Sequence, residues 1–282
     1  MKYNVAPHLR IKSSKLMKNL LLGNFKAAFS GKGIEFQDFR SYSYGDDAKY
    51  IDWATSTREW NIVLRRYKEE KDAHILCVLD ITEAYNPWKE SIKQRLQEQV
   101  TELIAEIALA SGESFGGFRM EQETVAHIAP KKNISALLSL LQRQKSQARD
   151  IKTALWVSFL VQYPMKRAII FVISESVYID EKSFLMASKK HDIVFIHLSA
   201  LVENTLQSTD VRVLSDGNIL FSVDSSDEHK RCLYEEKRTE QLQTLKQTLL
   251  RMNIESIFLD ETKNLFSEFY LLMKRKERQY IS

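Results

Sequence analysis

The sequence predicts an α/β protein built on a doubly wound, mainly parallel sheet. Four short apolar runs, rich in β-branched residues, occur at 74–81, 168–174, 192–198 and 254–260. Continuous apolar runs of this length are typical of strands that are covered on both faces. Stretches with helical periodicity separate these runs, and alternating strands and helices favour parallel strands joined by crossover helices.

The first 72 residues precede this regular pattern. Residues 15–29 predict an amphipathic helix, because apolar side chains recur every three or four positions with lysines between them. We expect this helix to dock on the body of the protein, and a membrane-surface helix is the alternative interpretation. Residues 31–72 follow neither period, which predicts an ordered loop region with short strands that ends in a strand at 62–70.

From residue 73 onward each element has its own signal. A helix with an apolar stripe over 92–107 lies between Pro87 and Gly112, which are typical of helix boundaries. Asp216-Gly217 between two alternating runs predicts a β-hairpin. The remaining expected elements are strands at 114–119 and 124–128, and helices at 133–146, 151–162, 180–190, 230–252 and from 261. We therefore divide the chain into an N-terminal segment, 1–72, packed on an α/β domain, 73–282.

Composition excludes several classes of protein. Of the 282 residues, 44% are hydrophobic and 28% are charged, unlike collagen-like, disordered or disulfide-scaffold chains. A net charge of +4, with no RNP, zinc-finger or helix-turn-helix signature, argues against nucleic-acid binding. No apolar stretch approaches the ~18 residues of a membrane span, and the N-terminus lacks a signal-peptide pattern. With only two cysteines, Cys77 and Cys232, these features predict a cytoplasmic protein.

Ligands of open parallel sheets bind beyond the carboxyl ends of the strands, so the residues that follow the apolar runs are candidates. Asp80 and Thr82 follow the first run, and Ser174 and Glu175 follow the second. Their oxygens suit a hard cation such as Mg²⁺. The alternative is a metal-free loop whose polar side chains form hydrogen bonds with neighbouring backbone groups.

The sequence contains no visible nucleophile of a hydrolase, because it has no G-x-S-x-G elbow and no Cys/His metal spacing. We therefore predict that the protein is not an enzyme. The alternative is a metal-dependent phosphodiesterase or nuclease that uses the carboxylates of Asp46, Asp47, Glu70 and Asp80. Structural ion pairs of such acidic groups with Arg40, Arg58 and Arg65 are the favoured interpretation.

One segment carries a specific resemblance. The stretch GKGIEFQDFRSYSYGDDAKYIDW, which begins at Gly31, resembles the motif of the bacterial family called domain of unknown function 58. The departures are mild, since Lys49 and Lys71 replace arginines and Thr57 replaces alanine. The matching residues are Gly31, Gly33, Glu35, Phe36, Arg40, Tyr42, Gly45, Asp46, Asp47, Ile51, Asp52, Trp53, Arg58, Glu69 and Glu70.

The resemblance implies a fold similar to von Willebrand factor A domains and a partner, a MoxR-type AAA+ ATPase. The implied role is a non-enzymatic adaptor in the assembly or maturation of an unidentified client protein. The metal site of such domains uses D-x-S-x-S, a later Thr and a later Asp, whereas this chain has D-I-T-E-A from Asp80 to Ala84. Asp80, Thr82 and Glu175 then form a degenerate site with weak or no Mg²⁺ affinity.

Overall fold

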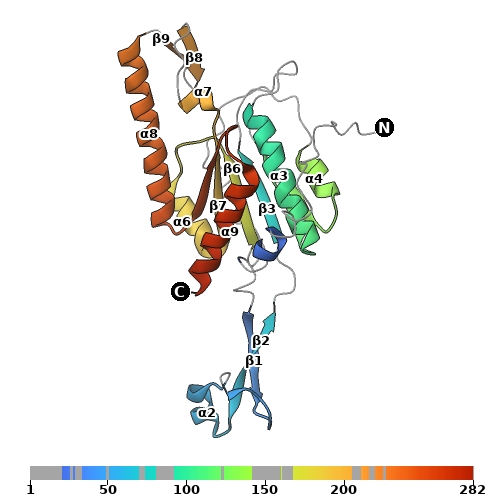
Figure 1. Cartoon of the computed structure of the whole chain (residues 1–282). Coiled ribbons are helices and arrows are strands. Elements are labelled where there is room, and N and C mark those ends of the chain that lie inside the picture. Colours follow the sequence, from blue (N-terminus) through green and yellow to red (C-terminus); the bar gives the residue numbers. More distant parts are fainter. Residues whose placement is uncertain are drawn as a thin grey trace.

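The computed structural model shows a helix-flanked central sheet and a separate hairpin that projects beyond one end of it (Figure 1). The structure describes residues 21–25, 28, 34–48, 51–69, 74–80, 92–121, 124–141, 160, 168–204, 211–215, 220–224 and 227–281.

The central sheet has six strands in the order β10-β7-β6-β3-β4-β5. All neighbouring strands are parallel except β4 and β5, which form an antiparallel edge. This arrangement confirms the predicted doubly wound, mainly parallel sheet. The strands are β3 (His74–Asp80), β4 (Ser114–Glu121), β5 (Thr124–Lys131), β6 (Ala168–Ser174), β7 (Asp192–Leu198) and β10 (Glu255–Leu259).

Helices cover both faces of the sheet, so its central strands are apolar throughout. Ile75 and Cys77 of β3 point to one core, which also contains apolar side chains of α3 (Ile92–Ala110), α4 (Ser135–Leu140) and α9 (Leu265–Ile281). Leu76 and Val78 point to the opposite core, beneath α6 (Glu181–Lys190) and α8 (Glu228–Arg251). Alternate residues of β3 thus pack against the helices on the two opposite faces of the sheet.

Part of the predicted N-terminal helix is described. Residues 21–25 are helical, and the side chains of Leu21, Phe25 and Ala28 are buried in the core that also contains α3 and α9. This packing supports the docked interpretation, because the apolar face of the helix is covered by protein. The rest of the predicted helix lies outside the described residues, as does the predicted 151–162 helix apart from Leu160.

Two smaller features complete the domain. The predicted hairpin is present as β8 (Val211–Ser215) and β9 (Leu220–Asp224), which pair antiparallel. A short helix that the sequence did not predict, α7 (Leu201–Asn204), follows β7 at the carboxyl end of the sheet. None of the described helices combines the length and apolar character needed to cross a bilayer.

The projecting hairpin consists of β1 (Ile34–Ser41) and β2 (Val63–Glu69), which pair antiparallel, with α2 (Trp53–Glu59) between them. We call residues 39–48 and 51–64 the hairpin tip. We expected the N-terminal segment to pack on the sheet domain, whereas β1, β2 and α2 extend away from it (Figure 1). The tip holds itself together, since Val63 and Leu64 are buried within it and Ile51 bridges to Leu64.

Candidate functional site

The carboxyl edge of the sheet brings two predicted site residues together. Asp80 ends β3 and Ser174 ends β6, and the two are directly paired in the parallel ladder. The Ser174 hydroxyl donates to Asp80 Oδ2 at 2.9 Å and accepts from the Ser176 amide at 3.0 Å. Both side chains are buried, so the hydrogen bond between them replaces hydrogen bonds that they would otherwise make to water.

A buried lysine dominates the same edge. Lys93 lies at the start of α3, and its Nζ is 2.5 Å from Glu175 Oε2 and 2.6 Å from Glu203 Oε1. Only 9% of the Lys93 side chain is exposed. Glu175 follows β6 and Glu203 belongs to α7, so one ammonium group connects three segments that are distant in sequence.

Two side chains of helix α8 contact the same group of residues. The guanidinium of Arg238 lies 3.8 Å from Glu203 Oε2, and the Tyr234 hydroxyl donates to the Glu203 carbonyl at 3.0 Å. We call Lys93, Glu175, Glu203 and Arg238 the Lys93 cluster. It contains two cations and two carboxylates, so its formal charges balance.

The surroundings fix the protonation states of two groups at this edge. Burial disfavours the Lys93 ammonium, but Glu175 and Glu203 outweigh that effect, and the pKa of Lys93 is raised overall. His197 on β7 is also buried, and desolvation, followed by the charges of Arg238 and Lys93, lowers its pKa to about 3. His197 is therefore a neutral imidazole at neutral pH and adds no charge to the Lys93 cluster.

The Mg²⁺ site that the resemblance implies can be compared with this geometry. Of the predicted ligands, Glu175 is taken by Lys93, Asp80 accepts from Ser174, and Thr82 lies outside the described residues. Within the described ranges, no group of three or more His, Cys, Asp or Glu side chains is arranged to hold a metal ion. Among the described residues, Asp80 and Glu175 have these other partners and do not form the implied ion site.

The four carboxylates of the alternative enzyme hypothesis do not meet. Asp46 and Asp47 lie in the hairpin tip, whereas Asp80 is the last residue of β3 in the central sheet. Figure 1 shows the tip separated from the sheet by the length of the β1–β2 ladder. Glu70 lies outside the described residues. A single metal centre cannot use both Asp46 and Asp80.

The family-motif residues build the hairpin tip. Arg40 holds Asp46 in a bidentate pair, with Nη1 to Oδ2 at 2.9 Å and Nη2 to Oδ1 at 2.7 Å. The same carboxylate accepts from the Ser43 amide at 2.8 Å, and Gly45 supplies the positive φ of +102° that the turn needs. Hydrogen bonding to Arg40 lowers the pKa of Asp46, which keeps the pair ionised.

A second set of motif residues builds α2. Asp52 is buried and caps the helix, with its carboxylate accepting from the Thr55 amide at 3.0 Å. Trp53 is the first residue of α2, and Arg58 lies in its last turn. The side chain of Arg58 is exposed and has no partner within the described part of the chain. Gly33 lies outside that part, as do the side chains of Glu35 and Glu69.

The tip exposes several aromatic side chains. Tyr44 is fully exposed, Trp60 is 95% exposed and Trp53 is 67% exposed, while Phe39 and Tyr42 are partly exposed. The sequence does not indicate this exposure, because aromatic residues in a segment of mixed charge are more often packed against other side chains. The structure instead leaves them on the surface.

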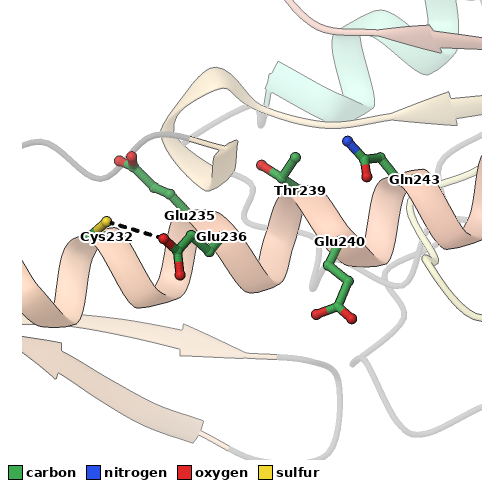
Figure 2. Close-up of a pocket in the computed structure, with 6 residues that line it drawn as sticks. All are labelled: Cys232, Glu235, Glu236, Thr239, Glu240 and Gln243. Atoms are coloured by element: carbon green, nitrogen blue, oxygen red, sulfur yellow. Dashed lines mark hydrogen bonds between the residues drawn. The ribbon is translucent and has the colours of Figure 1, made fainter.

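A surface hollow of about 370 Å³ lies along α8 and is lined by Cys232, Glu235, Glu236, Thr239, Glu240 and Gln243. Figure 2 shows that these side chains are spread along one helix and do not converge on a common point. Cys232 Sγ lies 3.7 Å from Glu236 Oε1, and the nearby carboxylates, Glu236 first, raise the pKa of its thiol. A protonated thiol beside carboxylates is a poor nucleophile, so this hollow has no catalytic arrangement.

Comparisons with known proteins identify the family. The family model described as "Protein of unknown function DUF58" matches residues 38–244, and the chain belongs to this family. A comparison with curated proteins gives no match. Among solved structures, the PilB minor pilin from Streptococcus sanguinis is 10% identical, with a TM-score of 0.34 over 77% of this chain and 64% of that chain. A likeness this low supports no conclusion about this protein.

Proposed function

We propose that the protein is a non-enzymatic interaction module that acts as an adaptor for a MoxR-type AAA+ ATPase in the assembly or maturation of a client protein. The family resemblance is the source of the named partner. The observation that supports an interaction role is the exposed aromatic surface of the hairpin tip. Its residues overlap those of the family motif, so we place the ATPase at the tip and the client elsewhere on the chain.

The amount of exposed aromatic surface supports a protein partner. Tyr44, Trp53 and Trp60 each carry ~150–250 Å² of surface, so together they expose on the order of 500 Å². All three side chains belong to the hairpin tip, and a contiguous apolar patch of a few hundred Å² is often functional. The exposed area is also a large part of the ~800 Å² that each partner contributes to a standard protein interface.

The chemistry of α2 suggests what the partner presents. Trp53 is the first residue of α2 and Trp60 directly follows the helix, while Arg58 is exposed in its last turn. Trp and Arg are the residue types that most often dominate binding energy at interfaces. Because Arg58 has no described partner in the free protein, the complementary surface is an apolar pocket of the ATPase beside a carboxylate.

The test is a binding titration of the full chain with the purified MoxR-type ATPase of the same genome, in ATP and in ADP. We expect the double variant Trp53→Ala/Trp60→Ala to weaken binding at least about tenfold, since each hot-spot side chain contributes more than ~1 kcal/mol. Arg58→Glu tests the charge, and it should weaken binding more at low salt than at high salt.

The matched control is Leu250→Ala. Leu250 is 75% exposed on α8, so this change also removes an exposed apolar side chain but lies outside the tip. We expect the control to bind like wild type. Equal binding by wild type and the double variant would show that the tip is not the docking surface, and absence of binding by wild type would refute the ATPase partner.

A further inference from the structure

We propose that the buried ammonium group of Lys93 occupies the position of a cation between the carboxylates of Glu175 and Glu203. The carboxyl edge is then independent of divalent metal in the wild-type protein. Removing the ammonium converts the same carboxylates into a divalent-cation site. This inference concerns the sheet edge and does not depend on the partner proposed for the hairpin tip.

The geometry of the contacts supports a cation position. Lys93 Nζ lies 2.5 Å from Glu175 Oε2 and 2.6 Å from Glu203 Oε1, so the two oxygens are at most about 5 Å apart with the nitrogen between them. Oxygen ligands of a divalent ion such as Mg²⁺ or Ca²⁺ lie ~2.0–2.6 Å from it. The two carboxylates are thus already held at separations that a metal ion would bridge.

The elements around the cluster keep this geometry in place. Glu175 directly follows β6, a strand that is buried along its whole length, and Glu203 is tied to α8 through Tyr234 and Arg238. Lys93 reaches the carboxylates from the first turn of α3, a helix whose body is packed in the core.

The charge balance explains why a metal would not bind alongside Lys93. The ammonium and the Arg238 guanidinium already neutralise the two carboxylates, and His197 is uncharged beside them. A divalent ion added beside the ammonium would bring a further cation to carboxylates that are already paired in a largely buried site, which is unfavourable. A divalent ion can therefore bind between these carboxylates only when the Lys93 ammonium group has been removed.

The test is a Mn²⁺ titration of the full chain, followed by the electron paramagnetic resonance signal of free Mn²⁺. Mn²⁺ serves as the probe because it prefers oxygen ligands. We expect wild type and Lys93→Arg to show no submillimolar stoichiometric site. Lys93→Met should bind one Mn²⁺ at least tenfold more tightly than wild type, and adding Glu203→Gln should abolish that gain.

Two results would overturn the inference. One is a 1:1 Mn²⁺ site in wild type that Glu175→Gln weakens, because the carboxylate would then bind metal despite Lys93. The other is a folded Lys93→Met variant with no gain in affinity. If Lys93→Met is unfolded without metal, circular dichroism must show that millimolar Mn²⁺ restores the fold, and failure to do so also overturns it.

Discussion

The carboxyl edge of the sheet and the hairpin tip use their side chains in opposite ways. At the edge, Lys93 is buried and its charge is fully taken up by Glu175 and Glu203. At the tip, Trp53 and Trp60 are largely exposed and contact solvent. The edge is where ligands of this fold class bind, yet Lys93, Glu175, Glu203 and Arg238 form ion pairs with one another there. The tip leaves its aromatic side chains exposed to solvent.

The difference has a physical cause in each region. Charges removed from water must be paired, so any ionised group at the buried edge requires a partner within the protein. Exposed aromatic side chains have no such requirement, but leaving ~500 Å² of apolar surface in water forgoes stabilisation of about 25 cal/mol per Å². Association with another molecule recovers that free energy. The edge therefore pairs its buried charges within the protein, whereas the tip leaves apolar surface in contact with solvent.

The largest expected effect is a loss of stability on removal of the Lys93 ammonium group at the carboxyl edge of the sheet. Lys93→Met leaves the carboxylates of Glu175 and Glu203 close together without their shared cation, and it should lower the free energy of unfolding by about 3–5 kcal/mol. Chemical denaturation without added metal measures this loss. The double variant that adds Glu175→Gln to Lys93→Met should recover most of it, because the remaining carboxylate of Glu203 keeps Arg238 as its partner.

The control for this prediction is a cation at the surface. Lys230 pairs with Asp227 at 3.3 Å on the exposed first turn of α8, where solvent screens the interaction. Lys230→Met should leave the free energy of unfolding unchanged within error. A loss as large in Lys230→Met as in Lys93→Met, or a stable Lys93→Met, would contradict the contrast between paired buried charge and screened surface charge.

A second prediction concerns the stability of the protein at acidic pH. The pKa of His197 is about 3 in the folded protein, below the ~6.5 of an unfolded histidine, so only the unfolded chain binds this proton between those values. Its contribution to stability is complete above pH 6.5 and decreases as pH falls toward 3. At pH 5 the loss is ~2 kcal/mol, from ~1.4 kcal/mol for each pH unit below 6.5.

The measurement is the free energy of unfolding at pH 7.5 and pH 5. His197→Phe keeps a ring against Phe258, whose ring centroid lies 5.4 Å from that of His197 in a tilted arrangement, and should lose less stability between the two pH values. His229 on the exposed start of α8 provides the control, because His229→Phe should keep the wild-type difference. Identical pH dependence in all three proteins would show that His197 is accessible to protons.

Most of the sheet could be predicted because each strand carries its own apolar signal. The run at 168–174 became β6 with the same bounds, since a strand covered on both faces must be apolar at every position. The short helices α2 and α7 could not be predicted in this way. Each is too short to show a helical period, and their ends are set by contacts such as the Asp52 cap.

The candidate site was predictable only in part. Strand ends place Asp80 beside Ser174, as expected for neighbouring parallel strands. Lys93 was missed although it continues the apolar stripe of α3, three residues before Leu96 and seven before Val100. A lysine on an apolar stripe at the first turn of a helix is a signal of a buried ion pair. Its partners come from remote segments, which no local pattern reveals.

The smallest expected effect on stability concerns Trp60 at the hairpin tip. Trp60 follows α2 with a φ of +52°, a conformation that costs a residue with a side chain ~1–2 kcal/mol. Glycine relieves this strain but loses ~0.5–1 kcal/mol of backbone entropy on folding. Trp60→Gly should therefore raise the free energy of unfolding by about 0.5 kcal/mol while weakening ATPase binding about fivefold or more.

The matched control for Trp60→Gly is Asn253→Gly, at a position with a φ of +56° after α8. Asparagine tolerates this conformation better than tryptophan does, so its replacement should gain less stability and leave binding unchanged. Paired denaturation and binding titrations of the two variants measure both effects. A Trp60→Gly protein that is less stable than wild type would show that the indole packs on the tip. In that case Trp60 would be a structural residue, and the two regions would differ less than their exposures indicate.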